Sequence, residues 1–296
     1  MALTIVRMID ATDTALVIEG GGMRNSYTAP AIVKLIEEDV RFGWAGGVSA
    51  GAGHAINYIS RDAFRAREAF TNFVRHEQFG GWKSLARGTG YFNAEFIYER
   101  SNDVLPFDWD AFVANEDTEL HIEAVRADTG HTAKWRKHDL ISMESIGQVT
   151  RASSTIPKVM PLAMIDGIPY VDGALGASGG LLIDAAEQAG FEKFLVLATK
   201  ERDYIRPTIT RPMATRRLFT KHPAVAEALI ARPARYNNSK KRILELEKQG
   251  RAKVFFPDQM IVDASERNVT KLNANYVLGQ AQLEREWKDW MEFIAA

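Results

Sequence analysis

The sequence has 296 residues, 46% of them hydrophobic, and a formal net charge of -1 at pH 7. This balance is typical of a globular protein and excludes a disordered chain, and the near-zero charge gives no overall basic field, so we expect no nucleic acid partner. The absence of cysteine excludes disulfides, thiol nucleophiles and thiolate metal sites.

No stretch of the sequence has the length and apolarity of a membrane span, and no basic segment precedes a long apolar run at the N-terminus. We therefore expect a soluble, cytoplasmic protein.

The first element is a buried strand at residues 14–19, which leads into Gly20-Gly21-Gly22-Met23-Arg24 and then a helix at 26–39. Three consecutive glycines leave backbone amides uncovered, and Arg24 adds a positive charge, so the turn is suited to hold an anionic oxygen. A phosphate would be held by the same groups, although the segment lacks both the Gly-x-Gly-x-x-Gly spacing and the Gly-Lys-Ser/Thr ending. A tight turn for packing alone is the third interpretation.

A second strand, at residues 42–45, leads into Gly47-x-Ser49-x-Gly51 and a helix of small residues at 50–59. This is the spacing of a nucleophile elbow, in which the serine lies on a sharp turn and bulky neighbours would prevent the strand and helix from meeting. Glycine-rich turns between a strand and a helix also occur without any catalytic role, so the pentapeptide alone leaves both interpretations open.

Residues 61–100 are rich in aromatic residues and arginine and are predicted to be helical. Packing over the core is the first interpretation, and an apolar wall or lid beside the serine, built around the glycine turns at 79–82 and 88–92, is the second. Two alternating segments, at 119–127 and 132–137, then predict a β-hairpin.

A helix predicted at residues 142–154 ends before Pro157, and Asp166-Gly167 predicts a tight hairpin turn. Asp172 follows the next short strand and precedes only small residues, which makes its carboxylate a candidate base. A further apolar strand at 193–199 completes an alternation of strands and helices. This alternation predicts a mostly parallel sheet that is covered on both faces.

Taken together, four segments resemble, in order and spacing, the signature blocks of the patatin-like phospholipases. They are Gly20-Gly21-Gly22-Met23-Arg24, Gly47-Val48-Ser49-Ala50-Gly51, Ala152-Ser153-Ser154-Thr155-Ile156-Pro157 and Asp172-Gly173-Ala174.

The resemblance implies a three-layer α/β/α fold and a Ser-Asp catalytic dyad that hydrolyses lipid acyl esters. It assigns the nucleophile to Ser49, the base to Asp172, and the elbow to Gly47 and Gly51. The implied oxyanion hole consists of Gly20, Gly21, Gly22, Met23 and Arg24. A dyad needs no histidine, and none of the six histidines has a distinctive setting; His54 lies on the same predicted helix as Ser49 and turns away from it.

One position departs from the family pattern, because Asn25 follows Arg24 where the family usually has glycine. Asparagine tolerates left-handed backbone, so we expect the turn to be preserved.

The last part of the chain, residues 201–296, is predicted to be a helical extension packed on a catalytic core at 14–200, as one continuous domain. It contains a helix at 239–249, a strand at 252–256, a helical region at 265–296, and a belt of basic residues interrupted by prolines. The belt consists of Arg202, Arg206, Arg211, Arg216, Arg217, Lys221, Arg232, Arg235, Lys240, Lys241 and Arg242. It is interpreted either as a solvated helical face or as a surface for peripheral contact with an anionic membrane on its inner face.

Three functions therefore remain open: a serine hydrolase of phospholipids or related lipid esters, a phosphoanion or nucleotide binding protein, and a non-catalytic lipid-binding protein. No metal-ligand spacing stands out in the sequence, so the hydrolase interpretation predicts a calcium-independent enzyme with no cofactor.

Overall fold

The computed structural model describes residues 8–81, 84, 88 and 90–296. Within them, eight strands form a single sheet in the order β5-β6-β3-β2-β1-β7-β8, with β4 paired to β3. The strands are β1 (Ile9–Ile18), β2 (Val40–Gly47), β3 (Glu119–Arg126), β4 (Thr132–Arg136), β5 (Ala163–Ile165), β6 (Ile168–Asp172), β7 (Lys193–Leu197) and β8 (Ala252–Phe255). The strands β3, β2, β1, β7 and β8 are mutually parallel, whereas β4, β5 and β6 pair antiparallel.

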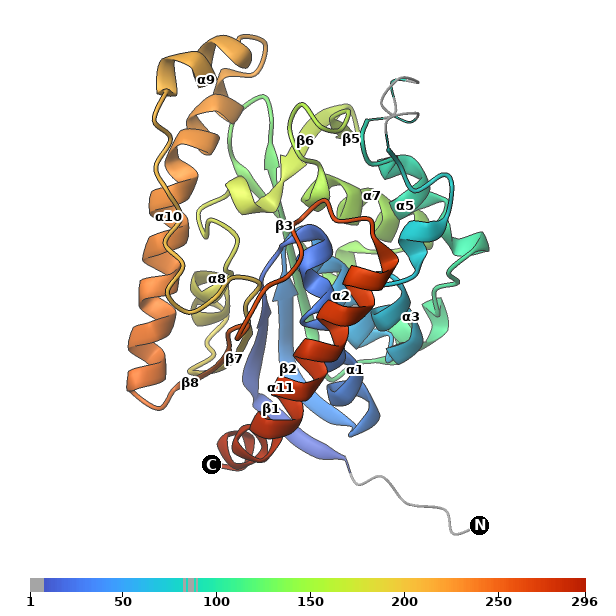
Figure 1. Ribbon diagram of the computed structural model, residues 1–296, viewed down its shortest axis with the longest axis vertical. Helices are drawn as coiled ribbons and strands as arrows, with labels where there is room; N and C mark the ends of the chain where they lie inside the picture. The colour runs from blue at the N-terminus through green and yellow to red at the C-terminus, as the bar shows by residue number, and fades with distance from the viewer. Residues whose placement is uncertain (1–7, 82–83, 85–87, 89) are drawn as a thin grey trace.

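Helices cover both faces of this sheet (Figure 1). They are α1 (Ala29–Glu37), α2 (Ala50–Ile59), α3 (Ala63–Glu68), α5 (Ala94–Glu99), α6 (Trp109–Ala114), α7 (Met143–Ser154), α8 (Ile183–Gln188), α9 (Pro212–Leu218), α10 (Pro223–Lys248) and α11 (Val269–Ala295). Successive side chains of β1 point to opposite faces of the sheet and pack against different helices. Leu16 and Ile18 pack in one core with residues of α1, α2 and α11. Ala15 and Val17 pack in the other with residues of α8 and α10. The predicted three-layer α/β/α fold is thus confirmed.

Beyond the last residue of β2 that pairs with β3, the antiparallel strand β6 pairs with β3 instead. β2 pairs with β3 as far as Gly47, opposite Ile122. Two residues further along β3, Ala124 pairs with Asp172, the last residue of β6. The end of β6 therefore lies directly beyond the end of β2, where the chain turns into α2.

Several predicted elements are found close to their expected bounds, among them α2, the β3–β4 hairpin and α7. The helix predicted at 239–249 is too short, because α10 begins at Pro223 and continues through Pro233. Proline is suited to the first turn of a helix, where Pro223 lies, but an interior proline normally breaks one. Pro233 is buried, and its packing offsets the hydrogen bond that it cannot form.

The segment predicted to be helical at 61–100 is divided into short helices. It contains α3, a single turn at Phe73–Arg75, and α5. Trp82 and Thr89, which belong to the two glycine turns predicted in this segment, lie outside the described residues.

Among the described residues, none of the helices combines the length and the apolar composition that crossing a membrane requires.

Candidate active site

Ser49 lies at the junction of β2 and α2 in a strained backbone conformation, with φ 55° and ψ -130°. A non-glycine residue with positive φ costs about 1–3 kcal/mol and persists only where its surroundings hold it. Here the N–H of Ser49 donates to the hydroxyl of Ser153 at 2.9 Å, and that hydroxyl donates to the carbonyl of Glu123 at 2.7 Å. The turn is thereby tied to both α7 and β3.

Gly47 and Gly51 let the strand and the helix approach each other at this turn. A Cβ on Gly47 would lie 2.4 Å from the carbonyl carbon of Gly51, and one on Gly51 would lie 2.4 Å from the carbonyl oxygen of Ile18. Both contacts are with backbone, which cannot move aside as a flexible side chain would. The two positions therefore require glycine for steric reasons.

Asp172 is brought to Ser49 by the pairing of β6 with β3. Its side chain accepts a hydrogen bond from the N–H of Ala174 at 2.8 Å and lies close enough to the Ser49 hydroxyl for that group to affect its pKa. Burial raises the pKa of Asp172 above its ordinary value, against the opposing effects of the nearby Arg232, the Ala174 N–H and the Ser49 hydroxyl. A carboxylate with a raised pKa is a better proton acceptor near neutral pH.

The glycine loop lies against the elbow, because a Cβ on Gly20 would be 3.0 Å from the Cβ of Ser49. The loop's amides differ in availability. The N–H of Met23 donates to the Ala264 carbonyl at 3.1 Å, and that of Arg24 donates to the Gly21 carbonyl at 3.3 Å. In the described part of the chain the N–H groups of Gly20, Gly21 and Gly22 have no such partner. The loop therefore offers its glycine amides, and not those of Met23 and Arg24.

Asn25 does not adopt the left-handed backbone that was expected of it. The positive φ of the loop is at Gly22, with φ 58°, and Asn25 lies inside the short 3-10 turn Gly22–Ser26. Its side-chain amide donates to the Glu19 carbonyl at 3.1 Å. Asn25 therefore fastens the loop to the end of β1 without backbone strain.

His54 of α2 is fully buried. Its Nε2 lies 3.1 Å from the Asn25 carbonyl, and its ring packs 4.1 Å from that of Phe70. Burial lowers the pKa of His54 to about 4, in spite of the hydrogen bond to Asn25. The histidine supports the loop and makes no contact with Asp172 or Ser49.

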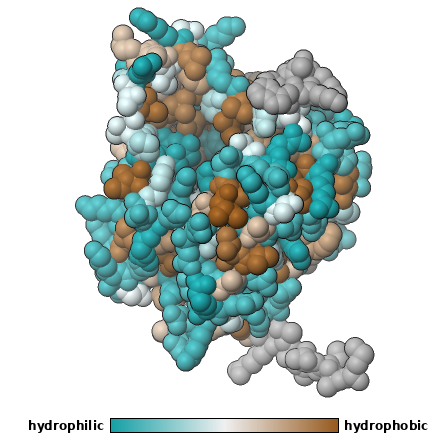
Figure 2. Space-filling model, in the orientation of Figure 1, coloured by the Kyte–Doolittle hydropathy of each residue, from teal (hydrophilic) through white to brown (hydrophobic). Residues whose placement is uncertain are grey.

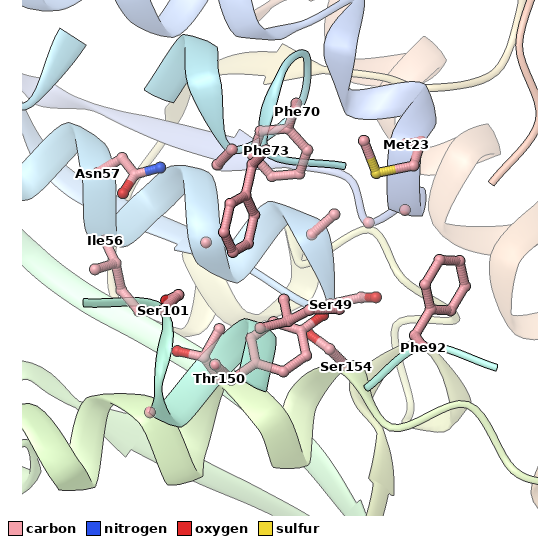
Figure 3. A pocket seen from close by; sticks show the side chains of 18 of the residues that line it. Met23, Ser49, Ile56, Asn57, Phe70, Phe73, Phe92, Ser101, Thr150 and Ser154 are labelled. Atoms are coloured by element: carbon pink, nitrogen blue, oxygen red, sulfur yellow. The ribbon is translucent and has the colours of Figure 1, made fainter. Parts of the chain in front are cut away.

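A cavity of about 440 Å³ opens beside Ser49. The glycine loop, Ser49, Asp172 and Arg232 lie together in its lining and form a polar end. The rest of the lining contains the charged residues Arg65, Glu99 and Glu144 and a larger apolar part, which includes Ile56, Phe70, Phe73, Phe79, Phe92, Ile97, Leu105 and Met160. Figure 3 shows Ser49 and Ser154 near each other, with Phe70 and Phe73 across the cavity from them. Phe79 and Phe92, from the predicted glycine turns, thus belong to its wall.

Three residues at this site were not assigned a role from the sequence. Ser153 was part of a signature block, but its bond to Ser49 depends on how α7 packs. Tyr98 lines the cavity near Asp172, and burial together with that carboxylate raises the pKa of Tyr98 to about 12, against an opposing effect of the nearby Ser154. Arg232 was one member of the basic belt, and only the placement of α10 reveals that it faces the site.

The structure divides the predicted basic belt among different surroundings. Arg202, Arg216 and Arg242 form ion pairs with glutamates, at 2.7, 2.6 and 2.6 Å. Arg235 and Lys240 donate to backbone carbonyls. The belt is therefore not one continuous cationic face, and peripheral contact with a membrane stays a prediction.

A serine on a strained strand-to-helix turn at the end of a largely parallel sheet is the arrangement of the α/β hydrolase elbow. The chain belongs to the patatin-like phospholipase family, whose model matches residues 16–184. This membership supports lipid acyl hydrolase activity in general terms. Residues 222–295, which include α10 and α11, match a second family model described as a domain of unknown function, DUF6363.

Among solved structures, the chain is similar to the crystal structure of VipD from Legionella pneumophila, with 11% sequence identity and a TM-score of 0.44. The similarity covers 92% of this chain and 66% of that one, so this chain spans slightly less than two thirds of VipD's length. A comparison with curated proteins finds no match.

Proposed function

We propose that Ser49 and Asp172 form the catalytic dyad of a lipid acyl hydrolase that cleaves carboxylic esters of phospholipids or related lipids. The observation that supports this most is that the two side chains line the same cavity, close enough for the Ser49 hydroxyl to lower the pKa of Asp172. Ser49 lies on a strained turn whose N–H is fixed by Ser153, and Asp172 is buried.

The proposed reaction has two steps. The Ser49 oxygen attacks the ester carbonyl while its proton passes to Asp172, and the alcohol leaves with that proton as the carbon–oxygen bond breaks. A water molecule then attacks the acyl-enzyme, gives a proton to Asp172, and releases the fatty acid as Ser49 recovers its proton. Asp172 thus serves as base and acid in turn.

The negative charge on the carbonyl oxygen needs donors that are already oriented, because these stabilise the transition state without reorganisation. Gly21 and Gly22 are the proposed donors, since their N–H groups are free among the described residues and their loop lies against the elbow. Met23 and Arg24 then serve to shape the loop through their own backbone bonds.

The apolar part of the cavity is the proposed acyl site. Its aromatic and aliphatic lining removes a hydrocarbon chain from water, which favours binding by about 0.8 kcal/mol for each buried methylene. Esters with longer acyl chains should therefore have a higher kcat/KM until the cavity is filled.

Hydrolysis of a p-nitrophenyl acyl ester series tests this proposal. Ser49→Ala and Asp172→Asn should each lower kcat/KM by at least about a thousandfold while circular dichroism shows a folded protein. Ser239→Ala, on α10 and away from the cavity lining, is the control that should retain activity, and a chelator should not reduce the rate. A folded wild type that hydrolyses none of the esters would reject the proposal and favour phosphoanion or lipid binding.

A further inference from the structure

Three arginines from separate parts of the chain converge behind the polar end of the cavity. Arg24 comes from the glycine loop, Arg206 from the segment between β7 and α9, and Arg232 from α10. Burial is the largest cause of the lowered pKa of Arg24 and of Arg232. The charge of Arg206 also lowers the pKa of both Arg24 and Arg232, and the charge of Arg24 lowers that of Arg232. Lys200 is also affected by the charges of Arg24 and Arg206.

None of these three arginines has a partner for its Nε atom, although that atom is buried in each of them. Among the described residues, no carboxylate lies within 4.0 Å of any of the three guanidinium groups. Buried charges are normally paired, because an unpaired one is costly to remove from water.

The nearby carboxylates are already engaged. Glu19, which is 2% exposed, accepts from the N–H of Thr199 at 2.6 Å and lies near the Tyr236 hydroxyl, whose pKa is raised by burial and by this carboxylate. Asp172 accepts from the N–H of Ala174 and lies near the Ser49 hydroxyl. Asp263, near Arg24, accepts from Ser265, and Glu201, near Lys200, accepts from the N–H of Met260. Among the described residues, none of these four carboxylates forms an ion pair with Arg24, Arg206 or Arg232.

This group faces the substrate, because Arg24 and Arg232 line the same cavity as Ser49 and Asp172. Phe70 and Phe73 of the apolar lining lie across the cavity from Ser49. When an acyl chain occupies the apolar part and its ester carbonyl lies at Ser49, the alcohol portion of the ester is left at the arginines.

We propose that Arg232, supported by Arg24 and Arg206, binds a phosphate group on the alcohol portion of the substrate, so that α10 supplies the head-group subsite of the active site. The planar guanidinium matches phosphate oxygens in a bidentate way, which distinguishes it from a lysine ammonium. This inference rests on the proposed hydrolase function. It gives a role to a residue in the region that matches a domain of unknown function.

The test compares two soluble esters that differ only in the phosphate, dihexanoyl phosphatidic acid and dihexanoylglycerol. Wild type should prefer the phosphatidic acid, and Arg232→Gln should lower the ratio of the two kcat/KM values by about ten- to a hundredfold, the effect of losing a charge-assisted hydrogen bond. Arg232→Lys should retain part of the preference. Lys241→Gln removes a charge from an exposed position on the same helix and should leave the ratio unchanged.

The ratio matters because Arg232 also lowers the pKa of Asp172. Without Arg232 the pKa of Asp172 would rise, so the hydrolysis of both esters would be slower at acidic pH. The ratio of the two kcat/KM values separates this general effect from recognition of phosphate. A loss of the same factor for both esters across the pH range, or no change for either, would overturn the proposal.

Thermal stabilisation by inorganic phosphate provides a readout that does not depend on catalysis. Stabilisation of wild type but not of Arg232→Gln is the expected result. If wild type hydrolyses neither ester, the hydrolase function fails, and this stabilisation alone then supports an anion site; its absence would overturn the site as well. If Arg232→Gln loses phosphate stabilisation but keeps the ester ratio, the site binds free phosphate and the head-group assignment is wrong.

Discussion

Ser49 and Asp172 each carry a local cost in stability. Ser49 has a positive φ, and Asp172 is a carboxylate whose pKa is raised mainly by burial, so its ionised form is disfavoured in the folded protein. Such features persist where the surrounding structure holds them, and they cluster at functional sites. Here the holding groups are Ser153, through its bond to Ser49, and Ala174, through its bond to Asp172.

His54 should make the free energy of unfolding depend on pH. Its pKa in the folded protein is about 4, below the ordinary value of 6.5, so the unfolded chain binds more protons between these values. The contribution of His54 to the free energy of unfolding is fully present above pH 6.5 and is lost as the pH falls toward 4. Between pH 7 and pH 5 the loss from this residue should be about 2 kcal/mol.

Urea unfolding at the two pH values measures this effect in wild type and in His54→Gln, whose amide can still donate to the Asn25 carbonyl. The difference in the free energy of unfolding between pH 7 and pH 5 should be smaller by about 2 kcal/mol in His54→Gln than in wild type. In His131→Gln, where the histidine is exposed, the difference should equal that of wild type. An equal pH dependence in His54→Gln and wild type would show that His54 is not buried in its neutral form.

At the scale of the elements, the junction of β2 and α2 can be tested with two glycines of one helix. Gly51→Ala would bring a Cβ within 2.4 Å of the Ile18 carbonyl oxygen and should destabilise the fold by about 3 kcal/mol. Gly53→Ala would meet only the ring of Phe70, at 3.8 Å, and should stabilise the protein by about 0.5–1 kcal/mol through its higher helix propensity. Thermal and urea unfolding measure both, and a Gly51→Ala variant as stable as Gly53→Ala would contradict the close packing.

The sequence was informative where neighbours along the chain decide the structure. The period of small residues after Ser49 predicted α2 with its correct bounds, and Asp166-Gly167 predicted the β5–β6 turn, where both residues have positive φ. The motif spacing also gave the positions of Ser49 and Asp172 at the ends of β2 and β6.

Features that depend on packing between distant segments could not be predicted in this way. The bond between Ser49 and Ser153 joins residues 104 apart in the sequence. The inward orientation of Arg232 requires the position of α10 on the sheet, and the continuation of α10 through Pro233 requires tertiary contacts that outweigh a helix-breaking residue. The hydrogen bonds of the Met23 and Arg24 N–H groups, to the carbonyls of Ala264 and Gly21, are likewise visible only in the structure.

At the scale of the whole molecule, the C-terminal region is joined to both faces of the sheet. β8 extends the sheet beside β7, while α10 packs in the core on one face and α11 in the core on the other. Figure 2 shows one face of the molecule, where apolar side chains occur in separate patches among polar ones. Because β8, α10 and α11 belong to the sheet and to the cores on its two faces, we propose that residues 14–200 and 201–296 fold as a single cooperative unit.

Calorimetry of wild type and Trp290→Ala tests this unit. Trp290 of α11 is fully buried in the core that contains Leu16 and Ile18 of β1. Its truncation should cost about 3–5 kcal/mol and lower the temperature of one single transition. Two separate transitions, with only one of them shifted by Trp290→Ala, would mean that the C-terminal region is an independent domain.

The most direct test of the central claim is covalent labelling of the protein by a fluorophosphonate, followed by mass spectrometry of its peptides. The account predicts one phosphonyl group per chain, attached to Ser49, with labelling at least about a hundredfold slower in Asp172→Asn and unchanged in folded His54→Gln. Labelling of another residue, or equal rates in Asp172→Asn and wild type, would show that Ser49 is not a nucleophile activated by Asp172.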